Sequence, residues 1–99
     1  MSHESPNQYQ ETQPLTFSEL VDMRHRLITE IDEAEARLGE LATQYMSDEI
    51  ELGYYRDCTD QLTYYIFETR IDLERVNRII KILSVRELSH MERLFSSEE

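Results

Sequence analysis

Apolar side chains recur in alternating steps of three and four residues along two stretches of the chain, one before and one after residues 46–49. This spacing places them along one face of an α-helix. Few residues remain for the connection, and two helices joined by about two to five residues pack antiparallel. The pattern therefore predicts an all-α fold built on a long antiparallel helical hairpin.

The first repeat predicts a helix over about residues 16–46. Thr16 and Glu19 have the spacing of a capping box, in which each side chain accepts a hydrogen bond from the other residue's amide. Val21, Ile28 and Ala42 widen the apolar face, which suits a helix with more than one neighbour. The repeat consists of Phe17, Leu20, Arg24, Leu27, Ile31, Ala34, Leu38, Leu41 and Tyr45.

The second repeat predicts a helix over about residues 49–83. Ser47 and Asp48 are its candidate N-caps, and Asp48 with Glu51 has the spacing of a second capping box. The repeat consists of Leu52, Tyr55, Thr59, Leu62, Ile66, Thr69, Leu73, Val76, Ile80 and Leu83.

The apolar rhythm changes after Leu83. The next apolar positions on a helical face are Leu88, Met91 and Phe95. Ser84 and Glu87 form a further potential capping box, so we favour a short third helix over about residues 85–95. The alternative is one continuous helix over about residues 49–95, because no glycine or proline follows Gly53 in this region.

The length of 99 residues fits a single helical domain over residues 15–96. Residues 1–14 are almost entirely polar and are expected to form a disordered tail. A hairpin buries only one face of each helix, so the free energy of burial barely offsets the entropy of ordering the chain. We therefore expect self-association or partner docking to complete a helical bundle.

Two further features concern the cellular compartment. The sequence has no apolar run of transmembrane length, and polar residues follow Met1 where a signal peptide would be apolar. We expect a cytoplasmic or otherwise intracellular protein. Cys58 is the single cysteine, which excludes an internal disulfide, and its simplest interpretation is a buried structural thiol.

The formal net charge is −11. Such a surface repels phosphate and anionic lipid, so neither direct nucleic-acid binding nor membrane binding is expected. One basic run opposes this trend. It consists of Arg70, Arg75, Arg78, Lys81 and Arg86. Pairing with nearby acids and with the helix dipole explains the run, and contact with an acidic partner is the alternative.

Signatures of catalysis are sparse in this sequence. It has no glycine-rich phosphate loop, no nucleophile elbow and no cysteine pair for zinc. Asp22 with His25, and Glu87 with His90, have the spacing of di-iron ligands, but the inward-facing glutamates that such a centre also requires are missing. We therefore expect no enzymatic activity, no cofactor, no metal site and no small-molecule substrate.

The segment 62–67 carries apolar and aromatic side chains on every side of its helix, and one hairpin partner cannot bury them all. Tyrosine-rich apolar surface with little lysine is typical of the centre of a protein interface. The alternative is that the third helix folds back and covers this belt within a monomer. The predicted partner-binding residues are Tyr54, Tyr64, Tyr65, Phe67, Ile71, Leu88, Met91 and Phe95.

These features predict a small acidic helical protein that acts in protein–protein interaction or assembly, as an accessory subunit, adaptor or chaperone-like protein. Its partner would be a second copy in a homodimer or another protein. The alternative is an acidic mimic of nucleic acid that inhibits a DNA- or RNA-binding protein. The carboxylates available for such mimicry are Asp22, Glu30, Glu33, Glu40, Asp48, Glu51, Asp57 and Asp60.

Overall fold

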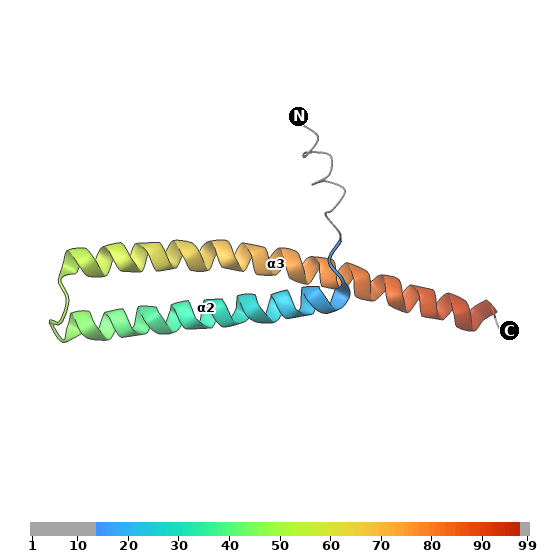
Figure 1. Cartoon of the computed structure of the whole chain (residues 1–99), viewed down its shortest axis with the longest axis horizontal. Helices are drawn as coiled ribbons and strands as arrows, with labels where there is room; N and C mark the ends of the chain where they lie inside the picture. Colours follow the sequence, from blue (N-terminus) through green and yellow to red (C-terminus); the bar gives the residue numbers. More distant parts are fainter. Residues whose placement is uncertain (1–13, 98–99) are drawn as a thin grey trace, which may run out of the picture.

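The structure is a computed structural model that describes residues 14–97, with side chains described as far as residue 88. Within these residues the chain forms two helices, α2 (Phe17–Met46) and α3 (Leu52–Ser97), and no strand. The helices lie side by side and antiparallel, and α3 continues well past the start of α2 (Figure 1). The all-α hairpin is confirmed, whereas most of the tail predicted for residues 1–14 lies outside the described residues.

The start of α2 has the hydrogen bonds of a capping box. The Glu19 amide donates to Thr16 Oγ1 at 3.1 Å, and the Thr16 amide donates to Glu19 Oε1 at 2.8 Å. These two bonds satisfy amides that have no acceptor within the helix. The Thr16 and Glu19 spacing in the sequence was therefore a reliable marker of this end.

The connection between the helices differs from the prediction. Asp48 does not cap α3: it adopts a left-handed conformation with φ of 61° just after the end of α2. Its amide donates to the Tyr45 carbonyl at 3.1 Å, and the Glu49 amide donates to the Gln44 carbonyl at 2.8 Å. This is the Schellman arrangement, which satisfies the last carbonyls of a helix. The local residues therefore end α2, and α3 begins at Leu52 instead of near residue 49.

The core lies along the predicted seam between the helices. Leu41 is fully buried, and Thr69 is the buried polar member. Phe17 and Leu52, at the ends of the two repeats, are about half exposed, so the seam is closed mainly in its middle. The buried hydrophobic residues are Leu20, Leu27, Ile31, Ala34, Leu41, Ile66, Val76 and Ile80.

Contacts between side chains of α2 and α3 at two points along the seam fix the register of the hairpin. The rings of Tyr45 and Tyr55 stack near the turn, with centroids 4.8 Å apart. Further along, Arg70 of α3 forms an ion pair with Glu35 of α2 on one side of the seam. In an antiparallel pair of helices, equivalent flanking positions face each other across the seam. The two helices therefore keep one register from the turn to the open end.

The separate third helix expected over residues 85–95 is not observed, because α3 runs without a break to Ser97. Ser84 is partly buried inside this helix and does not cap a new one. The region contains no glycine or proline, so the change in apolar rhythm alone did not end the helix. Nothing described in the chain folds back over α3, and its last turns project beyond α2 (Figure 1).

Candidate protein-binding surface

Three apolar side chains form a patch on the outer side of α3. Tyr64 is 66% exposed and Phe67 is 58% exposed, while Ile71 is partly buried. Their spacing of three and four residues puts them on one side of the helix, and the seam with α2 occupies another side. We call Tyr64, Phe67 and Ile71 the apolar patch. No described residue of α2 covers its two aromatic side chains.

The apolar patch belongs to a longer repeat along α3. The alternation of three- and four-residue steps continues in both directions, through charged residues and then through further apolar ones. Sequence reasoning missed it because only part of the repeat is apolar, although its spacing is as regular as that of the seam. We call this repeat the outer stripe. It consists of Asp57, Asp60, Tyr64, Phe67, Ile71, Glu74, Arg78, Lys81, Val85 and Leu88.

Every member of the outer stripe is exposed except Ile71, which is partly buried. The signs of its charges follow an order. Asp57 and Asp60 precede the apolar patch, whereas Arg78 and Lys81 follow it after Glu74. One helix therefore presents an acidic segment, an apolar segment and a basic segment in sequence along the same side.

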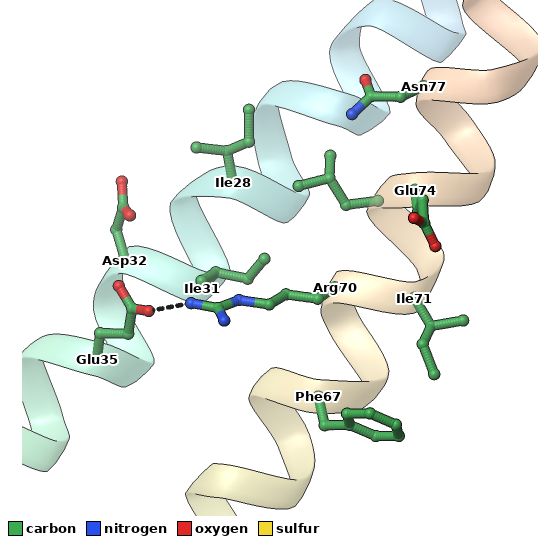
Figure 2. Close-up of a pocket in the computed structure, with 10 residues that line it drawn as sticks. Ile28, Ile31, Asp32, Glu35, Phe67, Arg70, Ile71, Glu74 and Asn77 are labelled. Carbon is green, nitrogen blue, oxygen red and sulfur yellow. Dashed lines mark hydrogen bonds and ion pairs between the residues drawn. The ribbon is translucent and has the colours of Figure 1, made fainter.

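A groove runs between the apolar patch and α2. Phe67 and Ile71 line it from α3, and Ile28 lines it from α2. Figure 2 shows Phe67 and Ile71 pointing away from α2, while Arg70 reaches across to Glu35. Polar side chains, among them Asp32 and Glu74, also line the groove, and the ion pair ties the two helices together across it. The groove could receive one side of a further helix next to the apolar patch.

The groove continues toward the start of α2. Ile28 and Asn77 line both this groove and the neighbouring hollow, whose other lining residues belong to α2. Asp22 and His25, one of the pairs with metal-ligand spacing, lie at this second hollow and are exposed. Within the described residues no group of three potential ligands from histidine, cysteine, aspartate and glutamate could hold a metal ion.

The structure separates Tyr65 from the apolar patch. Tyr65 lies on the opposite flank of the seam from Arg70, and its hydroxyl donates to Glu30 Oε1 at 3.0 Å. This hydrogen bond is the largest cause that raises the pKa of the Tyr65 phenol, and burial and the Glu30 charge act in the same direction. Tyr65 therefore contributes to the contact between α2 and α3.

The remaining predicted contact residues lie nearer the two ends of α3. Tyr54 is 52% exposed close to the turn, and Leu88 is 61% exposed beyond the end of the seam. The side chains of Met91 and Phe95 lie outside the described residues. The structure thus brings together Tyr64, Phe67 and Ile71 out of the eight predicted residues, and places Leu88 further along the same stripe.

The basic run is divided between two surfaces. Arg70 pairs with Glu35, and Arg75 Nη1 lies 3.6 Å from Asp72 Oδ1 within α3. Arg78 and Lys81 instead belong to the exposed outer stripe, and no ion pair joins either of them to another described residue. Local pairing therefore explains only part of the run.

Comparisons with known proteins add no relative to this picture. No protein-family model matches the chain, and no match is found among the curated proteins or the solved structures. Along the described residues, neither helix is long and apolar enough to cross a membrane.

Proposed function

We propose that this protein acts through protein–protein contact, and that the apolar patch on α3 is the centre of the contact surface. The observation that carries this proposal is the exposure of Tyr64 and Phe67 on a helix whose seam is already occupied by α2. Large aromatic side chains supply much of the binding energy in protein interfaces when they are buried on association. Clustered in one patch, they mark an interaction surface more strongly than isolated exposed residues.

The far end of α3 supports the same proposal. Beyond Leu83 the helix has no described partner, and Val85 and Leu88 are more than half exposed. An isolated helical segment of about 12 to 15 residues or fewer is only marginally stable in water. Contact with another helix would stabilise this end and bury its apolar side chains. An accessory or assembly protein that completes a bundle on binding fits both features.

The test compares Phe67→Ala with Leu73→Ala. Phe67 is exposed, whereas Leu73 packs against both parts of the buried core. We expect Leu73→Ala to lower the free energy of unfolding by about 2 kcal/mol or more, since it leaves a cavity in the seam. We expect Phe67→Ala to leave the folded hairpin intact and to weaken association, measured by sedimentation and by capture of binding proteins from the source cell.

Ile79→Ala is the matched control, because Ile79 is exposed on α3 and its position along the helix is turned away from the outer stripe. It should change neither folding nor association appreciably. The proposal is wrong if Phe67→Ala unfolds the chain as severely as Leu73→Ala. It is also wrong if every association of the wild-type chain survives Phe67→Ala unchanged.

A further inference from the structure

We propose that the outer stripe binds a second copy of this chain. The two α3 helices run antiparallel, and the two-fold axis passes at the level of Thr69 along each helix. This inference rests on the proposed function, because the apolar patch lies at the centre of the pairing. It goes further by naming the occupant, the orientation and the register. The resulting dimer has one two-fold axis, and each contact between different residues occurs twice.

The charge order along the outer stripe is complementary to its own reverse. When two stripes run in opposite directions, Asp60 of each copy faces Arg78 of the other. Asp57 likewise faces Lys81 of the other copy. All four side chains are exposed in the hairpin and are free to make these contacts. Opposite charges that meet across the contact line of an antiparallel helix pair favour one orientation and register.

The apolar members match in the same arrangement. Phe67 faces Ile71 of the second copy on both sides of the two-fold axis. Tyr64 faces Glu74, a carboxylate that can accept a hydrogen bond from the phenol. Glu74, the acidic member of the outer stripe between the apolar patch and the basic segment, therefore meets a hydrogen-bond donor instead of an apolar side chain.

The ends of the two α3 helices also meet in this register. Val85 of one copy lies opposite Gly53 of the other, and Leu88 reaches the turn that precedes α3. Gly53 has open space where a Cβ would stand, so a neighbouring helix can approach closely there. The part of α3 that projects beyond α2 thus lies along the turn end of the second hairpin, and its exposed Val85 and Leu88 gain a partner.

Shifts of the same stripe by one heptad lose this match. A shift of one heptad in one direction places Asp57 against Glu74, so two acids oppose each other. A shift in the other direction places Lys81 against Tyr64 and leaves charges facing apolar residues.

A parallel pair would set each residue against its own copy, so that acids face acids and bases face bases. Like charges across a helix interface are unfavourable. Among the arrangements compared, only the antiparallel register centred at Thr69 pairs the acidic segment with the basic segment and Phe67 with Ile71.

The experiment reverses the charges of one segment at a time. The acidic-segment variant carries Asp57→Lys and Asp60→Arg, and the basic-segment variant carries Arg78→Asp and Lys81→Asp. Each variant alone replaces the expected attractions with repulsions. We expect the dissociation constant of each homodimer to rise at least about tenfold, as measured by sedimentation equilibrium of the full chain.

Two combinations of these changes, one of two variants in solution and one within a single chain, make the test specific. An equimolar mixture of the two variants should form a heterodimer, because every reversed residue then meets an opposite charge. A variant with all four changes should regain the affinity of the wild-type homodimer. Glu33→Lys with Glu40→Arg on α2 makes the same change in net charge as the acidic-segment variant, and this control should dimerise like the wild type.

The outcomes separate this inference from the proposed function. If Phe67→Ala weakens self-association but the charge reversals do not, the antiparallel register is wrong while the apolar patch remains a contact surface. If the wild-type chain is monomeric at about 100 μM, a concentration that detects even weak dimers, the second copy is the wrong occupant. Capture of a different protein through Phe67 would then still support the proposed function.

Discussion

At the scale of single residues, the two flanks of the seam are held by different chemistry. Arg70 and Glu35 form an exposed ion pair, which contributes little to stability because water and salt screen it. Tyr65 forms a neutral-to-charged hydrogen bond with Glu30 on the other flank. These polar contacts fix the register, whereas the buried seam between them supplies most of the stabilisation.

Tyr65 should make the stability of the hairpin depend on alkaline pH. Because the pKa of the phenol is raised in the folded protein, the fold favours the protonated form. The stabilisation is then fully present below the unfolded pKa of about 10 and is lost as pH rises through the raised folded value.

Tyr65→Phe removes the hydrogen bond and the titration. We expect the Tm of this variant to lie below that of the wild type at neutral pH, and the difference to shrink above about pH 10. A difference that stays constant across the alkaline range would show that Glu30 does not affect the Tyr65 proton.

Two threonines in the seam give opposite expectations for replacement by valine. Thr59 Oγ1 is buried and has no hydrogen-bond partner among the described residues. Thr69 Oγ1 donates to the Tyr65 carbonyl at 2.7 Å. Thr59→Val should raise the free energy of unfolding by about 1 kcal/mol, because it removes an unsatisfied polar atom, whereas Thr69→Val should not stabilise the fold. Denaturant unfolding measures both, and equal effects would contradict this account.

At the scale of elements, the sequence predicted what repeated spacing controls. The two apolar repeats identified the seam, because the exclusion of apolar residues from water acts on the whole face of each helix. Thr16 and Glu19 identified the start of α2, because their hydrogen bonds are local.

The role of Asp48 could not be predicted from the sequence. The same residue types serve as an N-cap and as a left-handed residue after a helix, so its sequence neighbours did not decide between the two.

The outer stripe was only partly predictable for a related reason. Tyr64, Phe67 and Ile71 were visible as an apolar surface in the sequence. The charged members of the stripe, Asp57 and Lys81, lie within the predicted second helix and were missed because they are not apolar. The continuation of the stripe to Val85 and Leu88 became evident only when α3 proved to be one unbroken helix, since a break near Ser84 would rotate these residues out of line. Tyr65 required the structure as well, because sequence spacing does not show which exposed hydroxyl meets an acceptor on the other helix.

The turn offers a direct test at this scale. Asp48 adopts a φ of 61°, which glycine tolerates better than any residue with a side chain. We expect Asp48→Gly to raise the free energy of unfolding by up to about 1 kcal/mol. Asp48→Val should lower it by about 1 to 2 kcal/mol, because a β-branched side chain disfavours the left-handed conformation. If Asp48→Gly destabilises the hairpin, the turn geometry described above is wrong.

At the scale of the whole molecule, association could be driven by charge–charge attraction at the acidic surface or by burial of apolar side chains. Some carboxylates that could imitate phosphates already have partners, since Glu30 accepts from Tyr65 and Glu40 pairs with Arg37. The proposed contact has an apolar centre flanked by a few charge pairs. Its strength should therefore depend on hydrophobic burial more than on charge.

Salt titration separates these forces. Between about 0.05 and 0.5 M salt we expect the dissociation constant to change by less than about tenfold, because burial of Phe67 is not screened and only the flanking pairs are. A mimic of nucleic acid would lose affinity by several orders of magnitude over that range. Such a loss, removed by neutralising Asp57 and Asp60 but not by Phe67→Ala, would favour the mimic.

The most direct test of the proposed dimer is a distance between spin labels in the two copies. With Cys58 replaced by serine, one label is placed at Glu68 near the crossing point or at Arg86 near the far end of the pairing. At 1.5 Å of helix per residue, the antiparallel pair predicts a short distance for Glu68 and about 50 Å or more for Arg86. Similar short distances at both sites would show a parallel pair, and no intermolecular distance at either site would contradict association of α3 with a second copy.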